Sequence, residues 1–593
     1  MSKHTTWRLI DWGISLILGL ATWFFFGICY RHHLHYQEQM QLFLTTPDYF
    51  ETLIVRPGGL AIYIGRFVTQ FFYDSILGGA LIAGLLVLLQ RIILAISYFI
   101  ARKPIYALLS CLPSLGYIIL LLDENYLFSG LVALILSMAV LVGYIRLKSD
   151  SVRMVSLLIM IPLLYWFVGW AVITVVLFCL WYEWVGKKQM KRSRLWATTL
   201  VALFIYLVSP FIAKMIVPQY PLIRFWLAGD YYRYVMQYPL LPLSVFLLAV
   251  IIPLLYRWLP DKNSGKVGFV HLGGQSLLCI LLGGYGLTQV ADWNKEEIMA
   301  YDFYSRTQKW DQIIRLADKK SPDGPLTVAT LNLALSKKGY LPEYMFTYYQ
   351  NGIEGLLPSF NKEYIADMMT GEIYYHLGLI NTAQRFAFEA MEAIPDYQKS
   401  VRVIKRLAET NLINGAYEVA AKYLHTLQHT IIYRTWADET LRLLTDERII
   451  DTHPEYGRLR RIRPQEDFFF SEGEKDMILG MLYEHNHENR MAYEYLLAYT
   501  LLVKDLQRFM DYYWMGEQVM AYPVTPRGYQ EAMTCVWQAS GQQTQATLPP
   551  QIDRTMMQRF ESFRNMQRSV QYAEPLINSQ FGDTYWYYLY YRK

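Results

Sequence analysis

The sequence predicts an all-α protein, in which a polytopic bundle of transmembrane helices precedes a soluble α-solenoid. Nearly all continuous apolar runs lie before residue 292, and runs such as 195–213 are long enough to cross a hydrocarbon core of about 30 Å. After residue 293, apolar residues recur at helical spacing with little strand-like alternation. Small residues also repeat at a fixed interval between 300 and 450, which is typical of stacked helical hairpins.

The apolar half, residues 1–292, is predicted to cross the membrane about nine times. The short fifth and sixth runs are continuous in sequence, so they form either a tight hairpin at Gly169 or one long tilted helix. The expected crossings lie near 8–30, 75–98, 104–122, 127–146, 154–168, 169–186, 195–213, 239–258 and 270–290.

Basic turns predict the orientation of these crossings. Four short turns, near 102–103, 146–153, 187–194 and 257–266, are rich in lysine and arginine. Basic loops favour the cytoplasmic side. All four turns lie on one side only if the run 154–186 crosses twice, which favours the hairpin. The expected topology has the N-terminus inside and the C-terminal half outside.

Two outer segments, 31–74 and 214–238, are longer than a simple turn requires. Thr46 and Pro47 have the N-cap and first-position chemistry of a helix start, and the run Arg56-Pro-Gly-Gly59 is expected to end that helix. Residues 60–73 form an aromatic-rich amphipathic segment that suits a membrane interface. The second segment interleaves charged and aromatic residues beside two crossings.

The C-terminal half carries the internal repeat. Gly378, Ala383, Ala390 and Pro395 occupy a frame that recurs 37 residues later, from Gly415, without the proline. This pattern resembles the tetratricopeptide repeat, which implies an α-solenoid over 293–539 with a concave surface for a partner. Residues 540–593 are expected to form a polar linker and an aromatic-rich segment that packs on this domain or on the membrane surface.

Composition and motifs exclude several classes of function. The net charge of +5 is modest and concentrated in short loops, so nucleic acid is not an expected partner. The five cysteines suggest neither a disulfide framework nor a zinc site. Without a Walker A, Rossmann or kinase signature, no nucleotide cofactor is expected. His32, His33 and His35 have metal-ligand chemistry but fit an interfacial position better, so no metal is assigned.

The candidate chemistry lies in the outer segments. Asp48 and Glu51 have two interpretations: acidic residues that favour a helix N-terminus and face solvent, or a general base that removes a proton from an acceptor hydroxyl. Arginines on the same side of the membrane can hold the phosphate of a lipid-linked donor. The candidate phosphate ligands are Arg56, Arg224 and Arg233, and the further candidates are Glu38, Asp230 and Tyr231.

This layout resembles that of C-type integral-membrane glycosyltransferases, on the basis of its many crossings and its acidic first outer segment. The resemblance covers residues 1–290, with Asp48 and Glu51 as its motif. It implies a polyprenyl-phosphate-sugar donor, a catalytic carboxylate in the first outer segment, and transfer on the periplasmic face.

The whole chain also resembles a family of Bacteroidota inner-membrane proteins with tetratricopeptide-like C-terminal domains. The likeness rests on the general layout and on the Phe581-Gly-Asp-Thr-Tyr-Trp ending, and it assigns no activity. It implies a multi-pass protein of the bacterial inner membrane whose C-terminal domain lies in the periplasm.

Two functions follow from these observations. The first is a membrane glycosyltransferase or oligosaccharyl transferase, in which the repeat domain binds the acceptor or a partner protein. The second is a non-catalytic membrane scaffold that belongs to an envelope complex. The long first outer segment favours the transferase, because a simple anchor needs one crossing. A transporter ranks third, because few charges fall within the apolar runs.

Overall fold

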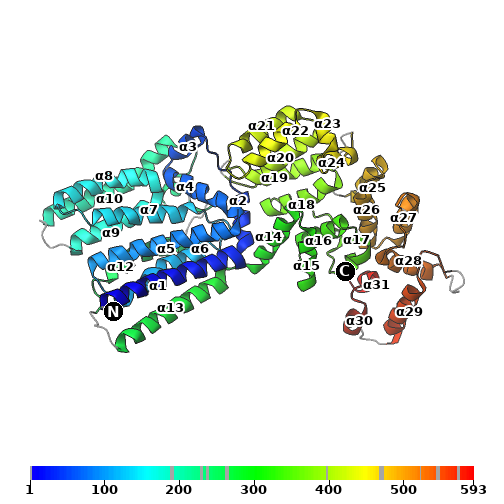
Figure 1. The fold of residues 1–593 in the computed structure, drawn as a ribbon, viewed down its shortest axis with the longest axis horizontal. Helices are drawn as coiled ribbons and strands as arrows, with labels where there is room; N and C mark the ends of the chain where they lie inside the picture. The colour runs from blue at the N-terminus through cyan, green and yellow to red at the C-terminus, as the bar shows by residue number, and fades with distance from the viewer. Residues whose placement is uncertain are drawn as a thin grey trace. The chain divides into compact units, whose positions relative to one another are not determined.

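A computed structural model of the chain describes residues 3–186, 192–226, 231–234, 240–260, 266–395, 398–465, 473–520, 522–541, 548–569 and 574–592. Within these ranges every extended regular element is a helix, and β-type pairing is limited to one bridge between Tyr126 and Tyr232. The all-α prediction is therefore confirmed. The chain divides into two compact units (Figure 1). Unit 1 comprises 1–296, 394–401 and 426–435, and unit 2 comprises 297–393, 402–425 and 436–593.

Unit 1 holds the apolar helices. Short 3₁₀ or π segments interrupt or extend several of them, at Phe25–Cys29, Gln70–Tyr73, Pro104–Cys111, Gly169–Ala171 and Tyr182–Gly186. Its α-helices are α1 (Lys3–Phe24), α2 (Arg31–Gln39), α3 (Pro47–Ile54), α4 (Gly59–Thr69), α5 (Ser75–Ile100), α6 (Leu112–Leu120), α7 (Ser129–Tyr144), α8 (Asp150–Val168), α9 (Val172–Trp181), α10 (Arg192–Ile216), α11 (Leu222–Trp226), α12 (Leu240–Leu255) and α13 (Lys266–Val290).

The described residues include five helical stretches that are long and apolar enough to cross a membrane. They are Thr6–Cys29, Ser75–Ile100, Asp150–Val185, Arg192–Ile216 and Val270–Val290. The prediction of nine such crossings is wrong. Pro104–Leu120, Ser129–Tyr144 and Leu240–Leu255 are apolar but only 10–17 residues long. An apolar run in the sequence does not report how much of it is continuous helix, and a spanning helix needs about 20 residues.

The stretch Asp150–Val185 folds back on itself at Gly169. Arg153 Nε donates to Glu183 Oε1 at 2.7 Å, although these residues would lie about 45 Å apart in a straight helix. The Tyr144 hydroxyl donates to the same carboxylate at 3.0 Å. Gly169 adopts φ +62° and ψ −138°, a conformation that strongly favours glycine. The hairpin is therefore the arrangement that the chain adopts.

Polar contacts show how the other helices of unit 1 run. The Tyr98 hydroxyl lies 3.0 Å from both carboxylate oxygens of Asp11, and Trp23 Nε1 donates to the Ile76 carbonyl at 3.2 Å. These two contacts make α1 and α5 antiparallel neighbours, as Figure 1 also shows. Lys103 donates to the Leu259 carbonyl, so the turns after α5 and α12 share one end of the unit.

Large apolar side chains face outward along α1, α10 and α13. Ile17 is 70% exposed, Phe204 66% and Ile280 69%, far more than a helix packed into a soluble core would leave open. Contiguous apolar surface of this kind marks contact with lipid or with another protein. The exposure is consistent with membrane association of unit 1.

Unit 2 consists of antiparallel helical neighbours such as α15 with α16, α18 with α19, and α25 with α26. Short 3₁₀ turns lie at Met345–Thr347 and Gly352–Gly355. The α-helices that follow α13 are α14 (Trp293–Arg306), α15 (Trp310–Lys319), α16 (Pro325–Lys337), α17 (Leu341–Tyr344), α18 (Tyr364–Leu377), α19 (Ile380–Glu392), α20 (Val401–Asn414), α21 (Tyr417–Gln428), α22 (Arg434–Leu443), α23 (Glu447–Thr452), α24 (Tyr456–Ile462), α25 (Lys475–His485), α26 (Arg490–Leu502), α27 (Leu506–Met520), α28 (Arg527–Ala539), α29 (Arg554–Ser569), α30 (Glu574–Phe581) and α31 (Tyr585–Tyr591).

The two glycines of the repeat frame terminate helices. Gly378 follows α18 with φ +92°, and Gly415 follows α20 with φ +81°, so each supplies the left-handed residue that ends a helix. Ala383 and Ala420, five residues after each glycine, are buried. The frame thus corresponds to two helical hairpins, whereas a tetratricopeptide solenoid over 293–539 stays a prediction.

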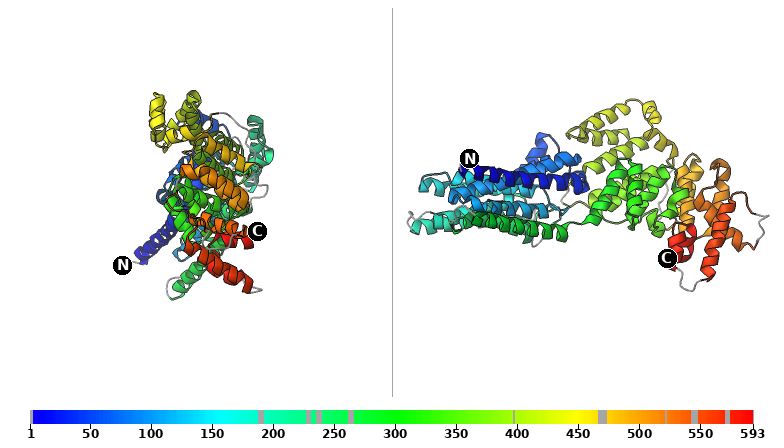
Figure 2. Two further views of the ribbon diagram at one scale, coloured as in Figure 1. Left: turned by 90° about the vertical axis from the view of Figure 1, so that its right-hand side faces the viewer. Right: turned by 60° about the horizontal axis from the view of Figure 1, so that its bottom comes forward.

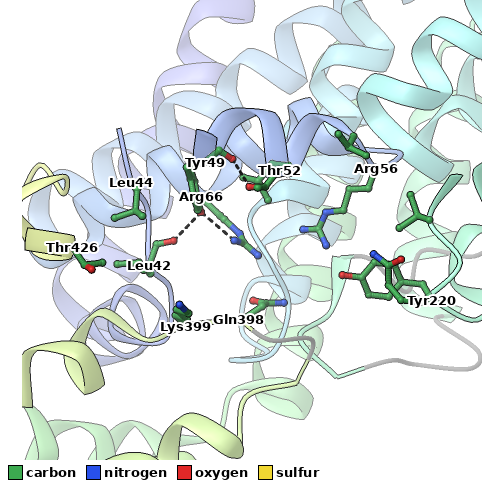
Figure 3. A pocket seen from close by; sticks show the side chains of 14 residues that line it. Leu42, Leu44, Tyr49, Thr52, Arg56, Arg66, Tyr220, Gln398, Lys399 and Thr426 are labelled. Atoms are coloured by element: carbon green, nitrogen blue, oxygen red, sulfur yellow. Dashed lines mark hydrogen bonds between the residues drawn. The ribbon is translucent and has the colours of Figure 1, made fainter. Parts of the chain in front are cut away.

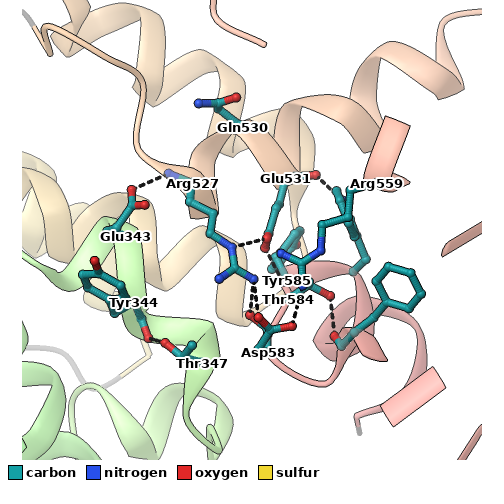
Figure 4. Close-up of polar contacts among 12 residues, drawn as sticks. Glu343, Tyr344, Thr347, Arg527, Gln530, Glu531, Arg559, Asp583, Thr584 and Tyr585 are labelled. Atoms are coloured by element: carbon teal, nitrogen blue, oxygen red, sulfur yellow. Dashed lines mark hydrogen bonds and ion pairs between the residues drawn. The ribbon is translucent and has the colours of Figure 1, made fainter. Parts of the chain in front are cut away.

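The aromatic C-terminal segment packs on α28, which agrees with the expectation from its composition (Figure 2). The Trp586 side chain is fully buried, and its Nε1 donates to the Glu531 carbonyl at 2.8 Å. Glu531 also accepts from the Tyr585 backbone N–H at 2.6 Å and from Arg527 Nε at 2.8 Å (Figure 4). Asp583 accepts from Arg527 and from Arg559, each at 2.8 Å.

Candidate functional site

The predicted first outer segment, 31–74, folds as three short α-helices, α2, α3 and α4, and a 3₁₀ segment, with a glycine turn between α3 and α4. Helix α3 begins at Pro47, and Thr46 has the extended backbone of an N-cap residue, although its side chain makes no capping hydrogen bond. Gly58 adopts φ +77° between α3 and α4, and its N–H donates to the Trp166 carbonyl of α8 at 2.8 Å. The sequence therefore predicted this helix and its end, and the turn is fixed against the hairpin at Gly169.

The chain between α2 and α3, from Gln39 to Thr45, forms hydrogen bonds with two segments that are distant in the sequence. The Thr45 N–H and hydroxyl both donate to the His429 carbonyl, at 2.9 and 3.0 Å. The Ser400 hydroxyl donates to the Gln39 carbonyl at 2.7 Å. Residues 394–401 and 426–435 thus belong to unit 1.

These segments enclose an open cavity of about 580 Å³ (Figure 3). Its wall combines aliphatic, tyrosine and cationic side chains. The lining residues are Leu42, Leu44, Tyr49, Thr52, Leu53, Val55, Arg56, Arg66, Val217, Gln219, Tyr220, Gln398, Lys399 and Thr426. Val217 directly follows α10, one of the helices long enough to cross a membrane, so the cavity lies beside the end of that helix.

Positive charge dominates this cation-lined cavity. Arg56, Arg66 and Lys399 enter it from three separate segments, and none of the described residues that line it is acidic. Tyr49 holds Arg66 in place: its hydroxyl accepts from Arg66 Nη1 at 3.1 Å and donates to the Leu42 carbonyl at 2.8 Å. The cavity combines several cationic hydrogen-bond donors with aliphatic side chains, which suits an amphiphile with a phosphate group.

The predicted catalytic carboxylates lie on α3 beside residues that line the cavity. Tyr49, Thr52 and Leu53 of α3, and Arg56 just beyond its end, contribute to the lining. Asp48 and Glu51 adjoin Tyr49 and Thr52 in the sequence and are exposed. Neither belongs to the described residues that line the cavity.

Glu38, the further acidic candidate, is buried rather than open to a substrate. Both of its carboxylate oxygens contact the Tyr433 hydroxyl, at 3.0 and 3.3 Å, and the Gln39 amide donates to the same carboxylate. Its relative exposure is 2%. Glu38 therefore joins α2 to the segment 426–435 within unit 1.

The other predicted phosphate ligands have structural contacts. Arg224 is buried, and its guanidinium lies 4.7 Å from the ring centroid of Tyr220, a residue that lines the cavity. Arg233 is fully buried, and its Nη1 donates to the Met40 carbonyl at 3.1 Å. The Tyr231 hydroxyl donates to the Val168 carbonyl at 2.6 Å and so supports the hairpin turn. Asp230 lies outside the described residues. Among the sequence-predicted site residues that the structure describes, only Arg56 lines the cavity.

His32 and His33, which have metal-ligand chemistry, form backbone hydrogen bonds at the start of α2. The backbone N–H groups of His32 and His33 donate to the two carboxylate oxygens of Glu296, at 2.8 and 2.9 Å, so this side chain caps α2. Burial raises the pKa of Glu296 to about 8 and lowers the pKa of His33 to about 4. Within the described residues, no group of three histidine, cysteine or acidic side chains could hold a metal ion.

Arg66, Tyr49 and Lys399 are among the cavity residues that were not identified from the sequence. Arg66 lies within the amphipathic run of α4, where a cation among apolar residues was the available signal. Tyr49 stood between the two acidic residues and received no role. Lys399 offered no local signal, because only the tertiary fold brings the segment 394–401 to the first outer segment.

Comparison of the sequence with protein-family models places the chain in a family. A family model described as a family of unknown function, DUF6057, matches residues 5–592, and the chain belongs to that family. No curated protein and no solved structure matches the chain.

Proposed function

We propose that this DUF6057 protein binds a phosphate-bearing lipid in the cation-lined cavity and uses it as the donor in glycosyl transfer. The observation that carries the proposal is the composition of the cavity wall. Three cationic side chains from three segments line it together with aliphatic side chains, and no acidic residue is among the described lining. Polyprenyl-phosphate sugars combine a charged phosphate with an apolar chain, and they match both parts of this wall.

The position of the cavity supports a donor that enters from a membrane. The cavity adjoins the end of α10, whose apolar side chains face outward. A lipid that lies beside α10 reaches Arg56, Arg66 and Lys399 without leaving the bilayer surface. Arginine presents several N–H donors in a planar fork, so one guanidinium can contact two phosphate oxygens.

Orientation follows from charge in this proposal. The basic turns after α5 and α12 lie at one end of unit 1, because Lys103 donates to the Leu259 carbonyl. The segments that line the cavity lie instead at the C-terminal ends of α8 and α10. By the positive-inside rule, the basic end faces the cytoplasm. We assign the cavity to the periplasmic face of a bacterial inner membrane, with the C-terminal helical unit on that same side.

Asp48 or Glu51 supplies the base in this scheme. The carboxylate takes the proton of an acceptor hydroxyl, the acceptor oxygen bonds to the anomeric carbon, and the lipid phosphate leaves with the electron pair of the broken bond. Both side chains are exposed on α3, one helical step from cavity residues Tyr49 and Thr52. The helical unit, read as tetratricopeptide-like, binds the acceptor or a partner protein.

Lipid titration followed by native mass spectrometry of the full chain tests the donor site. A polyprenyl phosphate should bind more tightly than a zwitterionic phospholipid. Arg66→Gln and Lys399→Gln should each weaken it about tenfold or more, because a hydrogen bond to a charged group contributes about 1.5–3 kcal/mol. Lys148→Gln, an exposed cation in a basic turn, is the matched control. Equal binding of both lipids, or equal loss in the control, would refute the donor site.

The transfer step has its own test. Asp48→Asn and Glu51→Gln should leave lipid binding intact, and one of them should abolish transfer of the lipid-linked sugar to an acceptor. If both variants bind the lipid and transfer at the wild-type rate, the base assignment is wrong.

A membrane scaffold is the second candidate, and the exposed position of Asp48 and Glu51 favours it. In that case the cavity holds a structural anionic lipid, and the helical unit recruits an envelope protein. The two functions separate in one experiment: a scaffold binds the phosphate lipid but releases no product with any acceptor.

A further inference from the structure

Unit 2 contains a second cationic cavity, which has no role in the proposed donor site. It encloses about 390 Å³ and is lined by the end of α16, by α24 and by the start of α26. Its described lining residues are Ser336, Lys337, Lys338, Gly339, Arg458, Arg461, Ile462, Glu488, Asn489, Arg490, Met491 and Glu494. All of them belong to unit 2.

Two of the five cations in this wall are already neutralised. Arg490 Nε lies 2.7 Å from Glu494 Oε1, and Lys338 Nζ lies 3.0 Å from Asp311. Glu494 is almost completely buried, so the pair with Arg490 forms part of the wall. These contacts leave three cations and one carboxylate, Glu488, in the described lining, so the cavity keeps a net positive charge.

Lys337, Arg458 and Arg461 have no carboxylate partner within ion-pair distance among the described residues. The Lys337 ammonium instead lies 6.0 Å from the Trp310 ring centroid. Burial, followed by the charge of Arg458, lowers the pKa of Lys337 to about 8. Burial also lowers the pKa of Arg458, where the charge of Arg461 acts in the same direction and the charge of Glu455 opposes it. Arg458 therefore faces two like charges, Lys337 and Arg461, which Glu455 compensates only in part.

The fold brings these cations together through one glycine turn. Asn489, the N-cap of α26, donates from Nδ2 to the Leu377 carbonyl at 2.9 Å. Ile462, at the end of α24, packs so closely on Gly378 that a Cβ there would lie 2.9 Å from it. The Gly378 turn thus holds the end of α24 and the start of α26, and it fixes the cations that line the cavity.

We propose that this cavity binds a phosphate monoester, with Lys337, Arg458 and Arg461 as the ligands of its oxygens. A monocarboxylate carries one negative charge and would leave most of the positive charge uncompensated. A phosphate monoester carries nearly two charges at neutral pH and offers three acceptor oxygens, which match three cationic side chains. The cavity volume suits a small phosphorylated molecule or a phosphorylated group of a larger one.

Calorimetric titration of the purified full chain with inorganic phosphate tests this site, at constant ionic strength set with chloride. Arg461→Gln, at an exposed position, should weaken phosphate binding about tenfold or more, the loss typical of one charged hydrogen bond. Arg458→Gln should do the same. Arg448→Gln, an exposed arginine of the same unit outside the cavity, is the matched control and should bind as the wild type does.

Thermal unfolding separates loss of a ligand group from loss of the fold. Without phosphate, Arg458→Gln and Arg461→Gln should unfold near the wild-type temperature, because neither side chain forms an ion pair among the described residues and each faces a neighbouring cation. With phosphate, only the wild type and the control should gain stability. A sugar phosphate that binds more tightly than inorganic phosphate would identify a small phosphoester as ligand, whereas equal affinity would identify free phosphate.

Two results would overturn the proposal. The first is the absence of a phosphate-dependent change in the wild type. The second is an equal response to acetate at the same ionic strength, because it would assign the cavity to carboxylates or to general screening. Neither result bears on the donor site of unit 1, since both variants and the control lie in unit 2.

Discussion

Removal of Arg153 should open the helical hairpin at Gly169. The Arg153 side chain is fully buried, and it donates to Glu183, to Asp150 and to the carbonyl of Leu147. Its replacement by methionine would leave the nearly buried carboxylate of Glu183 with only the Tyr144 hydroxyl. Loss of one partner of a buried ion pair typically costs about 3–5 kcal/mol, because the remaining charge is uncompensated.

The pair also allows a double-variant cycle. Arg153→Met/Glu183→Met removes both charges. Compared with Arg153→Met alone, it removes the uncompensated carboxylate and leaves the Tyr144 hydroxyl without its acceptor, a loss of about 1–3 kcal/mol. The double variant should therefore be more stable than Arg153→Met alone. Asp150 is 35% exposed and can be hydrated in both variants.

Thermal unfolding of the detergent-solubilised full chain measures these differences. Lys148→Met, an exposed cation near the same turn, is the control and should change the transition by little. If Arg153→Met unfolds at the same temperature as this control, the hairpin does not depend on the ion pair. If the double variant is less stable than Arg153→Met, the electrostatic argument fails.

Three further predictions concern other parts of the chain. The pKa of Glu296 is raised, so the folded state favours the protonated carboxyl. The contribution of Glu296 to the free energy of unfolding should therefore fall as pH rises from 4.5 to 8, with a slope of up to about 1.4 kcal/mol per pH unit. Glu296→Gln should reduce the pH dependence of the unfolding temperature between pH 6.5 and 8. Trp586→Ala should destabilise the C-terminal segment by about 3–5 kcal/mol and expose it to limited proteolysis, whereas the more exposed Tyr590→Ala should not. Gly169→Ala should lower the unfolding temperature of unit 1, because its backbone conformation costs about 1–3 kcal/mol for other residues; Gly143→Ala, in a helix with open space around it, should be neutral or stabilising.

Local signals predicted much of the fold. Proline and threonine chemistry located the start of α3, and Gly58 and Gly378 mark turns with positive φ. Charge patterning indicated a reversal at Gly169, which the contact of Arg153 with Glu183 confirms. The helix start and the turns depend on residues that are close together in the sequence. The reversal at Gly169 was predicted from the basic turns, which can all lie on one side of the membrane only if the chain reverses there.

The length of the apolar helices was less predictable from the sequence. The apolar run near 104–122 is divided into a 3₁₀ segment, Pro104–Cys111, and the α-helix Leu112–Leu120. Hydropathy records that such residues avoid water but not whether they form one continuous helix. The predicted number of crossings was therefore too high.

The candidate site was predicted only in part. Charged residues beside apolar runs were the available signal, and it did not separate Arg56, which lines the cavity, from Arg233, which is buried against Met40. The signal also favoured Asp48, whereas the lining of the cavity includes its neighbour Tyr49. Lys399 reaches the cavity through the tertiary fold, which no local pattern reports.

An experimental density map of the full chain in lipid nanodiscs that contain a polyprenyl phosphate would test the central claim most directly. The proposed function predicts phosphate density in the cation-lined cavity, within hydrogen-bonding distance of Arg56, Arg66 and Lys399, with the apolar chain directed along α10. Ordinary phospholipid in that cavity, or side chains that fill it while the polyprenyl phosphate stays in the bilayer, would contradict it.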